Sequence, residues 1–292
     1  MSIDVSVSSQ LPNASHPSAF LDRLGDRGER VRTYLCLGID PDPQALPQGF
    51  SRDAAGIEAF SRLLIEAAAP YAAAIKVNIS FFEAFGSAGI VALERIRSAV
   101  PSEIPFVIDA KRGDIGSTAV RQAVALYDVL GADAITANPY LGREALAPFL
   151  ERTDRFVFVL CRTSNPGAGE FQDLSLDGEP LYIHVARRVA VWAAAGDLVG
   201  VVVGATAREE LAAIRAAAPT LPFLVPGIGA QGGDVEAVLQ HGPATAPPGS
   251  ARAGGGLIVS VSRGIASAAL DAADPGAAIA RSAEVWAQQL SL

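Results

Sequence analysis

Short apolar segments alternate along the chain with longer segments rich in Ala, Leu, Arg and Glu. The apolar segments contain many β-branched residues and end in polar or glycine residues, which is typical of buried strands. The pattern predicts eight strands, at Tyr34–Asp40, Ala74–Asn78, Phe106–Lys111, Ala134–Asn138, Phe156–Arg162, Gly200–Ala205, Phe223–Gly227 and Leu257–Ser262.

The segments between these strands predict helices, among them Asp53–Ala69, Phe82–Ala99, Ser117–Leu130, Leu181–Ala195, Ala207–Ala217, Asp234–Gln240 and Ala277–Gln289. Hydrophobic strands that alternate with helices indicate a parallel sheet covered on both faces. Eight such units in about 270 residues fit one (β/α)8 TIM barrel. We therefore predict a single barrel domain over residues 18–292. An open, doubly wound sheet is the alternative.

Two segments depart from this rhythm. Residues 1–17 are polar and rich in serine, and we expect a disordered tail there. Residues 241–256, HGPATAPPGSARAGGG, are too rich in Gly and Pro to continue a helix. We expect them to form a flexible insertion between the seventh and eighth strands. A tolerated surface insertion is favoured over a functional lid.

The charge balance restricts the possible partners. The chain has 23 basic and 31 acidic residues, a net charge of −8 and a pI near 5.0. This argues against nucleic acid or an anionic membrane surface as the main partner, but one local basic pocket could still bind a phosphorylated small molecule. The first basic residue is Arg23, no signal peptide is evident, and the apolar segments are too short to cross a bilayer. We expect a soluble cytoplasmic protein.

Cysteine and histidine usage gives no sign of a metal site. Cys36 and Cys161 lie far apart in apolar segments, which is typical of reduced core thiols. His16, His184 and His241 are scattered and do not form a zinc-binding spacing. We therefore expect no zinc site.

Polar residues gather where the predicted strands end. The active site of a TIM barrel lies at the C-terminal ends of its strands, so polar residues there are candidates for function. They are Asp40, Lys76, Asn78, Asp109, Lys111, Asn138, Arg162, Ser164, Gln231, Ser262 and Arg263.

Only two of the 23 basic residues are lysines, and both are in this set. Lys76 and Lys111 lie in apolar strand-like segments, and a lysine can release a proton whereas an arginine remains charged. Asp109 and Lys111 are two residues apart and would share one strand face. With Asp40 and Lys76 they could form an alternating row of charges. A buried structural ion-pair layer is possible, but four charges at strand ends favour catalysis.

Two further features lie close to this row. Asp114 is three residues beyond Lys111, at the start of a predicted helix, where it could cap that helix or reach into a neighbouring subunit. The ends of strands seven and eight are a recurrent phosphate site in barrels. Here they read PGIGAQGGD (226–234) and SVSRGI (260–265), so glycine N–H groups and Arg263 could bind an anion.

The segment Phe106–Ala119, FVIDAKRGDIGSTA, resembles the signature of the orotidine 5′-phosphate decarboxylase family. The spacing D-x-K-x-x-D-I-G-x-T is filled throughout. D-x-K-x-x-D alone is shared by a wider barrel superfamily, and the extension narrows the resemblance. It covers the chain from about Ser18 onwards, and the length and the Lys-Val-Asn and Thr-x-Asn-Pro-Tyr segments are similar to the longer subgroup of the family.

The resemblance implies decarboxylation of orotidine 5′-phosphate to UMP and CO2, the last step of de novo UMP biosynthesis, without a metal or cofactor. It implies that Lys111 donates a proton to C6 of the pyrimidine and that Asp109 faces the substrate carboxylate. It also implies a homodimer with shared active sites. The other implied catalytic residues are Lys76, in the charge row, and Asp114, from the partner subunit. The implied substrate-binding residues are Asp40 and Lys76 at the ribose hydroxyls, Ser164 at the pyrimidine amide, Gln231 and Arg263 at the phosphate, Asn78, and Thr118 from the partner subunit.

Two other functions remain open. A Mg²⁺-dependent sugar-phosphate decarboxylase or hexulose-phosphate synthase of the same superfamily would use the same D-x-K-x-x-D residues. A catalytically inactive barrel could instead bind a phosphorylated ligand. The complete Lys and Asp set argues against an inactive protein.

Overall fold

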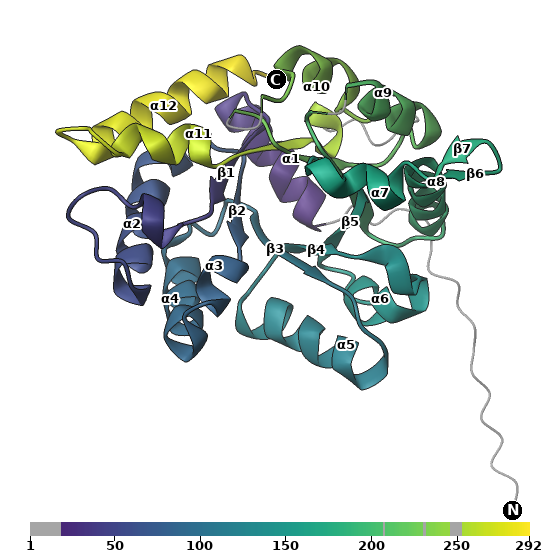
Figure 1. Cartoon of the computed structure of the whole chain (residues 1–292), viewed down its shortest axis with the longest axis horizontal. Helices are drawn as coiled ribbons and strands as arrows, with labels where there is room; N and C mark the ends of the chain where they lie inside the picture. The colour runs from purple at the N-terminus through teal and green to yellow at the C-terminus, as the bar shows by residue number, and fades with distance from the viewer. Residues whose placement is uncertain (1–18, 207, 230–231, 246–252) are drawn as a thin grey trace, which may run out of the picture.

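The computed structural model describes residues 19–206, 208–229, 232–245 and 253–292 (Figure 1). Within these residues, eight parallel strands close into a barrel in the order β1-β10-β9-β8-β5-β4-β3-β2. This confirms the predicted TIM barrel and excludes the open sheet. The barrel strands are β1 (Leu35–Ile39), β2 (Ala74–Asn78), β3 (Phe106–Arg112), β4 (Ala134–Ala137), β5 (Phe156–Arg162), β8 (Val199–Val203), β9 (Phe223–Pro226) and β10 (Ile258–Val261).

Helices surround the barrel and connect successive strands (Figure 1). They are α2 (Ala54–Ala68), α3 (Ser80–Glu83), α4 (Gly86–Ala99), α5 (Gly116–Ala123), α6 (Arg143–Leu150), α7 (Gly169–Gln172), α8 (Leu181–Ala194), α9 (Arg208–Ala217), α10 (Val235–His241), α11 (Arg263–Ala266) and α12 (Pro275–Gln289). A π-helical stretch, Val124–Val129, extends α5 to the end predicted for that helix. The short hairpin of β6 (Ser175–Leu176) and β7 (Glu179–Pro180) was not predicted.

The helix α1 (Ala19–Val31) closes one end of the barrel (Figure 1). Its Phe20 is buried and stacks on Phe156 of β5, with 5.2 Å between the ring centroids. Leu24 joins the same apolar cluster, which also contains inward-facing residues of the barrel strands such as Val107 and Ile258. Since these are early residues of their strands, α1 fills the N-terminal end of the barrel and leaves the opposite end to polar side chains.

The insertion predicted at 241–256 also begins and ends at the N-terminal end of the barrel. Its first residue, His241, is the last residue of α10, and its final residues form a 3-10 helix at Ala253–Gly256 before β10. Arg215 of α9 holds its start by donating hydrogen bonds to the carbonyl oxygens of His241 and Gly242. These parts lie opposite the C-terminal strand ends. Residues 246–252 and the predicted tail, 1–17, lie outside the described residues, so their flexibility stays a prediction.

None of the helices in the described part of the chain is both long enough and apolar enough to cross a membrane.

Candidate active site

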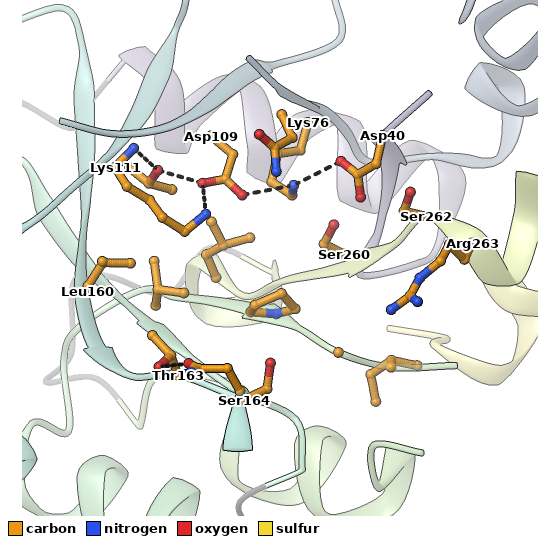
Figure 2. Close-up of a pocket in the computed structure, with 18 of the residues that line it drawn as sticks. Asp40, Lys76, Asp109, Lys111, Leu160, Thr163, Ser164, Ser260, Ser262 and Arg263 are labelled. Atoms are coloured by element: carbon orange, nitrogen blue, oxygen red, sulfur yellow. Dashed lines mark hydrogen bonds and ion pairs between the residues drawn. The ribbon is translucent and has the colours of Figure 1, made fainter. Parts of the chain in front are cut away.

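A cavity of about 440 Å³ opens at the C-terminal ends of the strands. Inward-facing positions alternate along each strand, so the same strands that bury apolar residues at the α1 end present polar residues here. Figure 2 shows several of these side chains around the cavity. The structure brings together eight of the predicted site residues at its lining: Asp40, Lys76, Asn78, Asp109, Lys111, Ser164, Ser262 and Arg263.

The predicted row of alternating charges is present along one wall of the cavity (Figure 2). Lys76 Nζ lies 3.9 Å from Asp40 Oδ1 and 3.3 Å from Asp109 Oδ2. Lys111 Nζ lies 2.6 Å from Asp109 Oδ1. Asp109 therefore bridges the two lysines, with one carboxylate oxygen towards each. Asp40 Oδ1 is buried on the Lys76 side and accepts no hydrogen bond from the described residues, while the Asp40 side chain as a whole is 26 % exposed and lines the cavity.

The row fixes the charge states of its two central members. Burial would by itself lower the pKa of the Lys76 ammonium, but the carboxylates of Asp40 and Asp109 outweigh it and raise that pKa above its ordinary value. Burial would likewise raise the pKa of Asp109, and here the ammonium groups of Lys76 and Lys111 outweigh it and lower that pKa. Lys76 is thus held as a cation and Asp109 as an anion.

The two lysines occupy different environments. The Lys76 side chain is 5 % exposed, whereas the Lys111 side chain is 49 % exposed. Both lysines come from apolar strand-like segments, but only Lys76 is buried. Lys111 lies near the end of β3, between the paired residues Ile108 and Arg112, and its side chain enters the open cavity.

The end of β3 is irregular at the residues that carry the charges. The pairing of β3 with β4 shifts between Ile108 and Arg112, where β3 has two more residues than β4 has over the same span. Lys111 has a left-handed backbone, with φ of 47°. Simple alternation along a strand does not hold across such a bulge. Asp109 and Lys111 nonetheless point to the same side, as their 2.6 Å contact requires.

The opposite end of the cavity is suited to an anion. Figure 2 shows Arg263 on the far side of the cavity from Lys111. The guanidinium of Arg263 has no carboxylate partner among the described residues, so its charge is available. Gly227, at the end of β9, lines the same end with a φ of 98°, a conformation that favours glycine. Gln231 lies outside the described residues.

Asp114 and Thr118 are not in the cavity lining of their own barrel. Asp114 Oδ1 accepts a hydrogen bond from the N–H of Ile115 at 2.8 Å, and Thr118 is exposed on α5. The surface beside them is apolar: Ile115 is 58 % exposed and Tyr140 on the next loop is 87 % exposed. The two loops are adjacent, because a Cβ on Gly113 would lie 2.8 Å from the backbone oxygen of Asn138.

The cavity also contains residues that the sequence analysis did not select. Their positions at inward-facing strand ends or in the loop after β5 could have identified them, once the register of each strand was known. They are Thr136, Leu160, Thr163, Asn165, Gln172, Val202 and Leu224, whereas Pro226, Gly227, Ile228 and Ser260 belong to the two segments predicted to bind an anion. Among them, Thr136 is bonded directly to the charge row.

In the described part of the chain, no three or more His, Cys, Asp and Glu side chains gather in a way that would hold a metal ion. Asp40 and Asp109, the two carboxylates of the cavity, are separated by the ammonium of Lys76.

A closed parallel barrel with alternating Asp and Lys side chains at its C-terminal strand ends defines a TIM-barrel enzyme. The sequence profile of the Orotidine 5′-phosphate decarboxylase / HUMPS family matches residues 33–280. The chain belongs to this family, as its signature segment predicted.

Individual relatives agree with this assignment. The chain is 46 % identical over 276 residues to an orotidine 5′-phosphate decarboxylase of Thermomicrobium roseum, covering 93 % of each chain. Among solved structures it is similar to the OMP decarboxylase of Leishmania donovani, with 42 % identity, a TM-score of 0.77 and coverage of 92 % of this chain and 98 % of that one. It also matches the UMP synthase of Leishmania donovani, with 42 % identity and a TM-score of 0.78, covering 92 % of this chain but 56 % of that longer chain.

Proposed function

We propose that this chain decarboxylates orotidine 5′-phosphate to UMP and CO2, the last step of UMP biosynthesis. The observation that carries the proposal is the row Asp40–Lys76–Asp109–Lys111 at the rim of a cavity large enough for a nucleotide. The names of the relatives described above support the same reaction. The complete row also argues against an inactive, purely ligand-binding barrel.

The chemistry explains why such a row is useful. When the C6–carboxylate bond breaks, its electron pair remains on C6 as a vinylic carbanion that the ring does not delocalise. The Lys111 ammonium, held at 2.6 Å from Asp109, would lie beside C6 and stabilise this charge as it develops. Its proton would then move to C6, giving UMP, and Lys111 would regain a proton from solvent.

Asp109 would have two roles, one towards Lys111 and one towards the substrate. Its position 2.6 Å from Lys111 Nζ orients the ammonium. A substrate carboxylate placed beside it would be repelled in the bound state, and the repulsion would disappear as neutral CO2 leaves. The lowered pKa of Asp109, in which the two neighbouring ammonium groups outweigh burial, keeps this negative charge in place at neutral pH.

The rest of the cavity would bind the nucleotide. Arg263, on the far side of the cavity from Lys111, would hold the phosphate, so that its binding energy orders the site rather than acting on the bond that breaks. Gln231 is proposed to bind the phosphate as well. The partly exposed Asp40 carboxylate, with Lys76, would bind ribose hydroxyls, and Asn78 would also contact the substrate. Ser164 would hydrogen-bond the pyrimidine amide.

We further propose a homodimer with shared active sites, in which Asp114 and Thr118 complete the site of the partner subunit. Both residues are absent from the cavity of their own barrel, and they lie beside the exposed apolar side chains of Ile115 and Tyr140. An apolar surface of this kind is typical of an interface between subunits.

The function is tested by following the ultraviolet absorbance change as orotidine 5′-phosphate is converted to UMP. We expect turnover by the unaltered protein, and a loss on the order of 10³-fold or more for Lys111→Ala, since the general acid is removed. EDTA should leave the rate unchanged. No turnover by the unaltered protein would refute the proposal. Activity that EDTA abolishes and Mg²⁺ restores would favour a Mg²⁺-dependent member of the superfamily.

A further inference from the structure

Thr136 makes two hydrogen bonds that join β4 to Asp109 and Lys111 of β3. Its side chain is at the end of β4 and is 1 % exposed. The hydroxyl oxygen accepts the backbone N–H of Lys111 at 2.9 Å. The same hydroxyl donates to Asp109 Oδ1 at 2.7 Å, the oxygen that also receives the Lys111 ammonium. One hydroxyl therefore contacts the backbone of Lys111 and the carboxylate that holds its side chain.

The contact with Thr136 lies at the bulge in β3, where the backbone of Lys111 lacks regular pairing with β4. Between Ile108 and Arg112 the regular pairing with β4 is interrupted, and Lys111 takes a left-handed conformation with φ of 47°. A non-glycine residue in that conformation is strained and persists only where neighbouring contacts hold it. The Lys111 N–H bonds to the Thr136 side chain instead of to a backbone carbonyl of β4.

The direction of the two bonds requires a hydroxyl. Because the Lys111 N–H donates to Oγ1, the hydroxyl proton is free to donate to Asp109. Valine has the same shape as threonine but would make neither bond. Serine would make both and would lose only a methyl group. A β-branched residue also suits a buried strand position, so Thr136 satisfies the strand and the site together.

We propose that Thr136 is a positioning residue that holds the Lys111 ammonium and the Asp109 carboxylate in the arrangement needed for proton transfer to substrate. The inference deepens the proposed function and rests on it. Thr136 acts through Asp109 and Lys111 rather than on the substrate, so its loss should reduce the rate of the chemical step more than substrate binding.

The experiment compares Thr136→Val with Thr136→Ser in steady-state turnover of orotidine 5′-phosphate. We expect kcat of Thr136→Val to fall about tenfold, which corresponds to about 1.4 kcal/mol in activation free energy, with KM within about twofold of the unaltered value. Thr136→Ser should keep kcat within about threefold. An effect on kcat without one on KM, together with rescue by serine, is not expected from general loosening of the fold.

Thr33 provides a matched control. Its side chain is also 1 % exposed. The Thr33 hydroxyl accepts a hydrogen bond from the N–H of Leu35 at 3.2 Å and donates one to the carbonyl oxygen of Leu290 at 3.0 Å. It precedes β1 and so lies at the opposite end of the barrel from the cavity. Thr33→Val should lower the thermal unfolding temperature about as much as Thr136→Val, yet leave kcat within about twofold.

The outcomes separate the two proposals. If the unaltered protein turns over substrate and Thr136→Val keeps its kcat, or if Thr136→Ser loses as much as Thr136→Val, the positioning role is refuted. If the unaltered protein has no turnover, the proposed function itself fails. Should Thr136→Val not fold, Thr136→Ala is compared with Thr136→Ser, which differs from it only by the hydroxyl. Equal kcat values for that pair would also refute the role.

Discussion

Sharing of the active site between subunits gives a quantitative prediction for mixtures of two inactive variants. In the proposed dimer, each site takes Lys111 from one subunit and Asp114 from the other. Lys111→Ala removes the proton donor of its own barrel, and Asp114→Ala removes the residue supplied to the partner's barrel. A heterodimer of the two has one site that lacks both residues and one site that lacks neither.

The expected recovery follows from this arrangement. Random exchange of equal amounts of the two variants makes about half of all dimers heterodimers, and half of the sites in each heterodimer are intact. The mixture should therefore regain about one quarter of the activity of the same amount of unaltered protein. Turnover of orotidine 5′-phosphate is measured before and after the subunits are exchanged in mild denaturant, and differently tagged chains report the amount of heterodimer formed.

A second mixture provides the control. Lys111→Ala and Asp109→Ala both damage the row within a single barrel, where these side chains lie 2.6 Å apart. Their heterodimer has no intact site and should stay inactive. If the Lys111→Ala and Asp114→Ala mixture also stays inactive although heterodimers are present, Asp114 does not complete the partner's site.

Two further predictions concern the charge row itself. Lys76→Arg should keep measurable activity, about 10- to 100-fold below the unaltered kcat, because the site needs mainly a positive charge there. Lys111→Arg should have none detectable, since a guanidinium does not release its proton, and equal kcat values for the two variants would contradict this division. Asp109→Asn should lower the free energy of unfolding by about 3 kcal/mol at pH 7, because Lys76 stays buried with one carboxylate fewer. The Asp109 pKa is lowered in the folded state, so this contribution is complete above the unfolded value of about 3.9 and is lost as pH falls further. Urea unfolding should therefore show a constant difference between the two proteins from about pH 7 to pH 5 and a smaller one below about pH 4; a difference that persists unchanged to pH 3 would refute the assignment.

The barrel was predictable from sequence because each strand carries its own signal. All eight predicted strands are present with ends within about two residues. The charge row followed from the same pattern, since the C-terminal ends of parallel strands must meet at one end of a barrel. Lys76 and Asp109 could therefore be placed together although they are 33 residues apart.

The features that the sequence did not reveal depend on contacts between segments. The position of α1 across the barrel end depends on Phe20 meeting Phe156, a long-range contact with no local pattern. The bulge at the end of β3 depends on its pairing with β4, so neither the left-handed Lys111 nor its bond to Thr136 could be predicted from the spacing of Asp109 and Lys111. The half-exposed state of Lys111 follows from the same irregularity.

The bulge explains how two lysines of one row come to have different properties. Lys76 lies within a regular strand, 5 % exposed between two carboxylates that raise its pKa despite burial, so it keeps its proton and acts as a fixed charge. Lys111 lies in the bulge of β3, and its side chain is 49 % exposed in the cavity. A proton donor must meet substrate on one side and recover its proton from solvent after each turnover. Of the two, only Lys111 has that access, and the local departure from regular strand geometry provides it.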